Sequence, residues 1–238
     1  MKLSKAKIVV FATAGVTVAL LAAILFPYIR YIDRDQAMHN AITRDDKITV
    51  ARLLDGGLDT LTQSNALVYA CTETRVEIVR MMLEHGVDPN NRDYEGKLPL
   101  SWAIIFATGT SEKRYLPVIK LLLEHGAQIN TGVPGFLPPL SEAAGYDERE
   151  VIKLLLQHGA DVNYHNSRHS TALYEAQKYA NAPTTTVLLA AGADPFIPGL
   201  DGKLPIDKAR FINRVVTVGL LKEAMAKWKP KATNGHQK

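Results

Sequence analysis

Cysteine is almost absent from this sequence, and so are the acceptor sites for N-linked glycans. Cys71 is the only cysteine among 238 residues, so an intramolecular disulfide cannot form. It follows Ala70 in an apolar stretch, which predicts a small buried hydrophobic side chain. No Asn-x-Ser/Thr acceptor occurs, which argues against a secreted eukaryotic glycoprotein.

The short motifs of common enzymes are also missing. The sequence contains no G-x-S-x-G, H-E-x-x-H or C-x-x-C motif and no glycine-rich loop that could hold a phosphate group. His165 and His169 lie close together, but no cysteine or carboxylate accompanies them, so they do not predict a metal site. We expect no enzymatic activity, no cofactor and no bound metal ion.

Excess positive charge is missing from the central part of the chain. Residues 36–226 hold 19 basic and 22 acidic residues, so the formal net charge of +4 comes from the two ends. A nucleic-acid-binding protein needs a basic footprint on its folded surface. We therefore expect no nucleic-acid partner.

One long apolar run is present near the N-terminus. Residues 8–29 contain no charged side chain, and about 20 apolar residues suffice for a helix to cross a bilayer. Lys2, Lys5 and Lys7 precede the run, so the positive-inside rule puts residues 1–7 in the cytoplasm and the rest beyond the membrane. We expect a single transmembrane signal anchor at 8–29 and a linker at 30–35.

A cleaved signal peptide is the alternative for this segment. Its apolar core would span about 7–15 residues and end at a small-x-small cleavage site. The run here is longer, and the ATA at 12–14 comes too early. Ala19, Ala22 and Ala23 keep the alternative open.

Between residues 36 and 226 the sequence repeats. The phrases NALVYA, LPLSWA, PPLSEA, TALYEA and LPIDKA align at one apolar position, with separations of 33, 40, 33 and 33 residues. That position holds Leu67, Leu100, Leu140, Leu173 and Ile206. A glycine after an apolar stretch recurs in parallel, at Gly57, Gly86, Gly126, Gly159 and Gly192. We expect each repeat to hold a short helix, a tight connection and a second helix that ends at the glycine.

The period of 33, together with HGVDPN at 85–90 and HGADVN at 158–163, resembles the ankyrin-repeat family. The resemblance implies an all-α solenoid of helix pairs with hairpin loops. It spans residues 36–226 in about six units, of which the first and last are caps. Residues 227–238 form a polar, basic tail that we expect to be disordered.

Two places depart from the regular repeat. Residues 107–114, ATGTSEKR, carry most of seven extra residues in the third unit, and we expect them to lengthen the connection between its helices. The stretch Thr60–Ser64 lies where the repeats are only 29 residues apart, and we expect a short loop there without a full hairpin.

Ankyrin-type proteins bind partners through hairpin tips and the exposed face of the first helices. The hairpin positions carried over from the resemblance are Tyr94, Glu95, Lys97 and Arg168. The first-helix positions are Ile105, Phe106, Tyr146, Lys178, Tyr179 and Phe211. Aromatic side chains are enriched at interface hot spots, so we expect a partner-binding surface. The alternative is that these rings pack between neighbouring repeats.

These features predict a non-enzymatic protein-binding module in a bacterial inner membrane, with its C-terminal domain in the periplasm. The chain is similar to membrane-tethered ankyrin proteins found beside secreted toxins, which implies an inhibitor or immunity protein. The other interpretation is an accessory scaffold that supports a periplasmic enzyme or an envelope complex.

Overall fold

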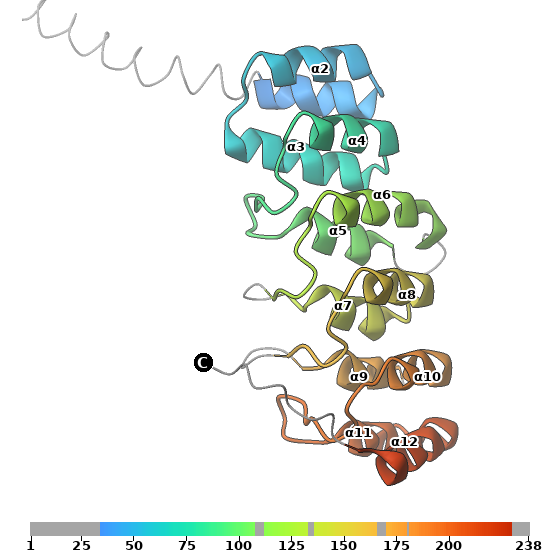
Figure 1. Ribbon diagram of the computed structural model, residues 1–238. Coiled ribbons are helices and arrows are strands. Elements are labelled where there is room, and N and C mark those ends of the chain that lie inside the picture. Colours follow the sequence, from blue (N-terminus) through green and yellow to red (C-terminus); the bar gives the residue numbers. More distant parts are fainter. Residues whose placement is uncertain (1–33, 108–111, 133–135, 166–169, 180, 230–238) are drawn as a thin grey trace, which may run out of the picture. The chain divides into compact units, whose positions relative to one another are not determined.

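A computed structural model describes residues 34–107, 112–132, 136–165, 170–179 and 181–229, and these residues form helices and loops without any strand (Figure 1). The chain divides into two compact units, Met1–Leu58 and Asp59–Lys238. The predicted anchor at 8–29 and most of the linker and tail lie outside the described residues. Within the described ranges, no helix combines the length and the apolar character needed to cross a membrane.

The N-terminal unit contains one helix pair in its described part. Its helices span residues 34–43 and α2 (Lys47–Asp55). Asp46 caps α2, because its carboxylate accepts hydrogen bonds from the Thr49 amide at 3.1 Å and the Thr49 hydroxyl at 2.6 Å. Arg34 donates to the carbonyl of Gly57 at 3.0 Å, which ties the start of the pair to its end.

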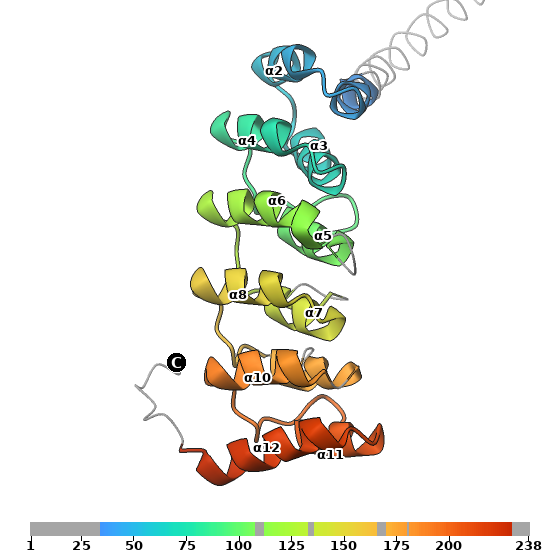
Figure 2. The same ribbon diagram turned by 90° about the vertical axis from the view of Figure 1, so that its right-hand side faces the viewer.

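The C-terminal unit contains five helix pairs among its described residues. They are α3 (Thr60–Thr72) with α4 (Val76–Glu84), α5 (Pro99–Phe106) with α6 (Glu112–Glu124), α7 (Pro139–Tyr146) with α8 (Arg149–Gln157), α9 (Ala172–Glu175) and the 3₁₀ helix η2 (Ala176–Lys178) with α10 (Ala182–Ala190), and α11 (Pro205–Phe211) with α12 (Val215–Lys227). First helices contact the first helices of neighbouring pairs, and second helices do likewise (Figure 2). This two-column stack agrees with the predicted solenoid of helix pairs.

The aligned apolar position forms the centre of this stack. All five of its side chains, Leu67, Leu100, Leu140, Leu173 and Ile206, are buried. In α8, Val151, Ile152 and Leu155 are also fully buried, at the spacing that places them on one helical face. The periodicity therefore predicted the core register correctly.

The glycine that follows each of the second helices α2, α4, α6, α8 and α10 adopts a left-handed conformation. Its φ angle ranges from 70° at Gly57 to 91° at Gly192, a region that a residue with a β-carbon enters only at a cost in energy. The histidine before three of these glycines caps the same turn. The Nδ1 atoms of His85, His125 and His158 lie 2.8–2.9 Å from the carbonyl four residues earlier.

Thr60–Ser64 is helical, so the prediction of a loop at these residues is wrong, whereas the predicted absence of a full hairpin is confirmed. These residues form the first turns of α3, and Asp59 stands at its N-cap. The Asp59 carboxylate accepts hydrogen bonds from the Thr62 amide at 3.0 Å and the Thr62 hydroxyl at 2.7 Å. A capped helix start thus replaces the hairpin that the neighbouring repeats have at this place.

The insertion in the third unit also differs from its prediction. The helix α6 has 13 residues, whereas α4, α8 and α10 have 9 each, so part of the insertion lengthens the helix and not only the connection. The added turn contacts the preceding repeat. Arg114 Nε donates to the Thr74 hydroxyl at 2.7 Å, and the Tyr115 hydroxyl donates to the Thr72 carbonyl at 2.7 Å.

A candidate protein-binding surface

The C-terminal ends of the first helices carry exposed aromatic side chains in successive repeats. The exposed fraction is 45% for Phe106, 38% for Tyr146, 55% for Tyr179 and 86% for Phe211. All four follow the buried position of their repeat by five or six residues. We call these four residues and Lys178 the aromatic stripe. Each of the four aromatic residues has more than a third of its surface exposed to solvent, so packing between repeats leaves part of each residue uncovered.

Phe106 is held in place by two neighbouring rings. Its centroid lies 5.7 Å from that of Trp102, one turn earlier in α5, and 6.4 Å from that of Tyr115 in α6. Tyr115 is itself buried and hydrogen-bonded to the preceding repeat. The added turn of α6 therefore supports this end of the aromatic stripe.

Lys178 connects two further members of the aromatic stripe. Its Nζ lies 5.3 Å from the ring centroid of Tyr146 and 5.4 Å from that of Tyr179. Both distances allow a cation–π attraction, which is strongest when a partner removes water from the contact. The two tyrosines belong to adjacent repeats, so the lysine orients rings on both sides of one repeat junction.

The hairpin before α5 is organised by a buried aspartate. Asp93 Oδ1 accepts hydrogen bonds from the amides of Glu95 and Lys97, each at 2.9 Å, and Oδ2 accepts one from Trp102 Nε1 at 2.5 Å. This arrangement leaves Tyr94 and Glu95 exposed at the hairpin tip. Two of the three predicted tip residues in this hairpin therefore face solvent.

Lys97 does not lie at the surface expected for it. Its residue is only 7% exposed, and its Nζ lies 3.7 Å from the ring centroid of Trp102 and 4.0 Å from that of Phe136. Long lysine stems pack along apolar surface, and a cation between two rings is electrostatically favourable. The side chain supports the hairpin and is not free to contact a partner.

Glu142 in α7 lies among these charged groups. Burial raises the pKa of its carboxyl group, whereas the positive charges of Lys97 and Lys178 and the amide of Leu137 act in the opposite direction. The negative charge of Glu175 adds to the upward shift. The carboxylate partly balances the positive charges of Lys97 and Lys178.

The positions of the other predicted residues do not show whether they contact a partner. Ile105 is half-buried, and Arg168 lies outside the described residues. The ring centroid of Phe211 lies 5.9 Å from Lys203 Nζ. Cys71 is fully buried, and burial raises the pKa of its thiol, so it remains protonated at neutral pH.

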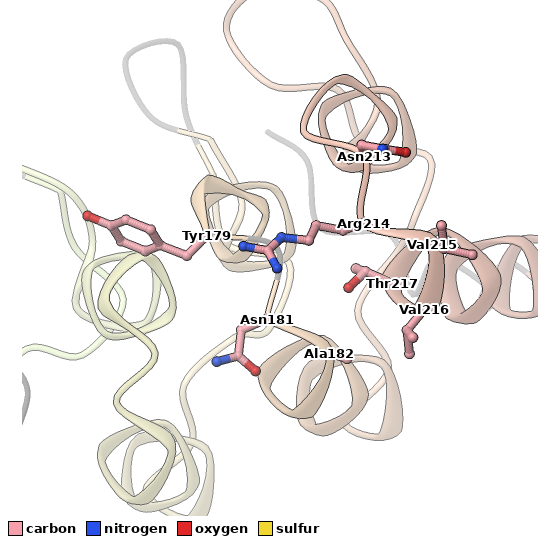
Figure 3. A pocket seen from close by; sticks show the side chains of 8 residues that line it. All are labelled: Tyr179, Asn181, Ala182, Asn213, Arg214, Val215, Val216 and Thr217. Carbon is pink, nitrogen blue, oxygen red and sulfur yellow. The ribbon is translucent and has the colours of Figure 1, made fainter.

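A cavity adjoins the aromatic stripe at the last repeat junction (Figure 3). It has a volume of about 550 Å³, and its lining residues are Tyr179, Asn181, Ala182, Asn213, Arg214, Val215, Val216 and Thr217. Of these residues, only Tyr179 was predicted from the sequence to bind a partner. The sequence did contain a sign of the cavity, because Val215 and Val216 begin the last second helix, whereas the equivalent residues at the start of α10 are Ala182 and Pro183.

The described residues offer no metal site, because no group of three or more His, Cys, Asp or Glu side chains is arranged to hold an ion. Lys178 and Tyr179 lie within cation–π distance of each other, an arrangement that suits recognition of another surface.

Comparison with known families gives matches over much of the chain. Residues 22–93 and 38–133 match the model described as "Ankyrin repeats (3 copies)", and residues 137–167 match "Ankyrin repeat". None of the curated proteins compared with the chain gives a match. The family matches cover more than half of the chain, and they show that it belongs to the ankyrin-repeat family, whose members generally act as protein–protein interaction modules and not as enzymes.

Proposed function

We propose that the aromatic stripe is the surface with which this ankyrin-repeat domain binds its protein partner. The observation that carries the proposal is the recurrence of a partly exposed aromatic ring at the end of successive first helices. Phe106, Tyr146 and Tyr179 occupy the same repeat position, and Phe211 stands one position earlier. A solenoid has only nearest-neighbour contacts, so a repeated exposed ring builds an extended surface.

The energetics of such a surface suit protein recognition. Tyrosine and other large side chains at the centre of an interface often contribute 2 kcal/mol or more, which is about a thirtyfold change in affinity. Tyr146 and Tyr179 are already oriented by Lys178. Less conformational entropy is therefore lost when they bind.

The test is capture of a partner by the full chain, solubilised in detergent, followed by calorimetry with the captured protein. We expect the double variant Tyr146→Ala/Tyr179→Ala to lower the affinity by at least about thirtyfold. Phe196→Ala is the matched control, because Phe196 is similarly exposed but lies in the hairpin before α11.

Circular dichroism and thermal melting of the double variant separate binding from folding. Unchanged affinity with an intact fold would move the binding surface to the hairpin tip at Tyr94 and Glu95 or to residues 107–114. A lost fold would mean that the two rings are part of the packing between repeats.

We further propose that the module is tethered to a bacterial inner membrane and acts in the periplasm. The proposal is supported by the uncharged residues 8–29 and by the three lysines that precede them. A tether restricts the domain to one side of the membrane. It also raises the effective concentration near other membrane-associated proteins.

In that setting we propose a role as an inhibitor or immunity protein that covers a secreted toxin or effector. An extended surface of exposed rings suits a protein that acts by covering another. Purified chain should inhibit the activity of the captured partner, and Tyr146→Ala/Tyr179→Ala should inhibit it less. A partner whose activity rises on binding would favour an accessory scaffold instead.

A further inference from the structure

Asp147 makes a specific connection between two repeats. It follows α7 with a left-handed φ of 65°. Its carboxylate accepts hydrogen bonds from Asn181 Nδ2 and from the Thr184 hydroxyl. Asn181 is the N-cap of α10 and Thr184 lies in its first turn, so at this junction a carboxylate occupies the start of the next second helix.

The following junction has equivalent positions, with a different residue in the place of Asp147. Thirty-three residues after Asn181 and Thr184 stand Arg214, the N-cap of α12, and Thr217 in its first turn. Thirty-three residues after Asp147 the sequence has Ala180, which lies outside the described residues. An alanine side chain cannot accept a hydrogen bond, so position 180 cannot supply the carboxylate that Asp147 supplies one repeat earlier.

The 550 Å³ cavity lies at this second junction. Arg214 is the charged residue in its lining, and no acidic residue lines it. Figure 3 shows the Arg214 side chain extending from the start of α12 toward the side of the cavity that Asn181 and Tyr179 line. Among the described residues Arg214 forms no ion pair within 4.0 Å. Its guanidinium can therefore donate two parallel hydrogen bonds to a carboxylate.

The cavity also has an apolar side. Val215 and Val216 open α12 with 77% and 69% of their surface exposed. The first turn of α12 contains no acidic residue, and the Arg214 side chain does not cap it. A ligand for this cavity should therefore combine a negative charge with an apolar group beside it.

We propose that this cavity receives an acidic side chain of the protein partner, an aspartate or glutamate flanked by an apolar residue. The carboxylate binds the Arg214 guanidinium, as the Asp147 carboxylate binds the equivalent start of α10, and the apolar neighbour packs on Val215 and Val216. The inference rests on the proposed function, because Tyr179 belongs both to the cavity and to the aromatic stripe.

Two blocked tripeptides serve as probes, leucyl-aspartyl-leucine and leucyl-asparaginyl-leucine, which are nearly equal in size and differ in charge. The full chain in nonionic detergent, labelled with nitrogen-15 at valine, reports binding through the amide signals of Val215 and Val216. The buried Val118 and Val151 are internal references. We expect saturable shifts at the first two valines and an affinity at least about tenfold higher for the aspartyl peptide.

Three variants test the role of the guanidinium. Arg214→Gln should abolish the preference for the aspartyl peptide, and Arg214→Lys should retain part of it, because a charge remains but the two-pronged geometry is lost. Arg210→Gln is the control, since Arg210 is exposed and paired with Asp207 at 3.1 Å outside the cavity. Circular dichroism should be unchanged in all three variants.

Several outcomes would overturn the proposal. These are equal affinity for the two peptides, no shift at Val215 and Val216, or a preference that survives Arg214→Gln. The variant Tyr146→Ala separates this inference from the proposed function, because Tyr146 does not line the cavity. If Tyr146→Ala weakens partner capture while the peptides show no charge preference, the aromatic stripe stands and the acidic-residue site fails. If the preference for the aspartyl peptide holds but Tyr146→Ala leaves partner capture unchanged, the proposed function fails and the carboxylate site stands.

Discussion

The side chain of Asn163 binds the main chain at the glycine that ends the next repeat, because its Nδ2 donates a hydrogen bond to the Gly192 carbonyl at 3.2 Å. Its Oδ1 also accepts a hydrogen bond from the Asp194 amide at 2.7 Å. Asn90 and Asn130 make the same two bonds to the equivalent residues of their following repeats. One asparagine position therefore connects successive repeats through their main chains, 29 to 38 residues apart in sequence.

Replacing Asn163 with alanine should destabilise the junction between the α7/α8 and α9/α10 repeats. Two hydrogen bonds are lost, so we expect the free energy of unfolding to fall by about 1–3 kcal/mol. Urea denaturation of the full chain measures the change. Gln157→Ala is the control, because Gln157 is exposed on α8 and should change the free energy by less than about 0.5 kcal/mol. Equal effects of the two variants would contradict a structural role for the asparagine bridge.

Truncating Leu155 to alanine should leave a cavity in the centre of the stack. Leu155 is fully buried in α8, and such truncations cost about 2–5 kcal/mol. The α8 helix contacts both α6 and α10, so the loss should reach neighbouring repeats and lower the melting temperature of the whole unit. A melting curve that matches the unaltered protein would show that the core register is wrong at this position.

Replacing Glu142 with glutamine should stabilise the protein at neutral pH. The folded-state pKa of Glu142 is raised above its ordinary value of 4.5, mainly by burial. The folded state therefore binds this proton more tightly than the unfolded state. The resulting stability is fully present below pH 4.5 and is lost as the pH rises through the folded-state pKa.

Glutamine cannot ionise, so Glu142→Gln avoids the cost of a buried charge at neutral pH. We expect urea denaturation to show a gain in the free energy of unfolding near pH 7 that shrinks as the pH falls through the folded-state pKa of Glu142 and is gone below pH 4.5. The groups that act on this carboxyl are Lys97, Lys178, Glu175 and the Leu137 amide. A loss of stability at neutral pH would mean that attraction to the two lysines outweighs the cost of burial.

The orientation of the chain in the membrane can be tested with reporter fusions. A reporter that is active only in the periplasm, fused after Lys238, should be active if the proposed orientation holds, in which Lys2, Lys5 and Lys7 lie in the cytoplasm. The protein should stay with membranes through a carbonate wash. Activity of a cytoplasmic reporter at the same position would reverse the proposed orientation. A soluble form that begins near residue 23 would instead indicate signal-peptide cleavage.

The sequence predicted those features that depend on residues close together in the chain. The apolar spacing in α8 and the glycine after each second helix follow from helix geometry and from the left-handed conformation of a glycine stop. The helical start of α3 was missed, although Asp59 and Thr62 form a local cap, because the repeat pattern favoured a loop there. The repeat pattern could not show that some of the added residues 107–114 belong to α6. The first turn of α6 is stabilised by contacts with Thr72 and Thr74 of the preceding repeat, which the pattern does not contain.

The amino-acid sequence by itself determined the family, the helix pairs and the buried face of each helix, because a 33-residue period repeats the same local interactions. Only the tertiary structure decided which side chains near the surface are available to a partner. Lys97 is covered by Phe136, which lies 39 positions later and belongs to the next repeat. The cavity beside Arg214 likewise requires the ends of two first helices and the starts of two second helices to meet. Such contacts join residues of different repeats, and their exposure depends on packing that no single repeat contains.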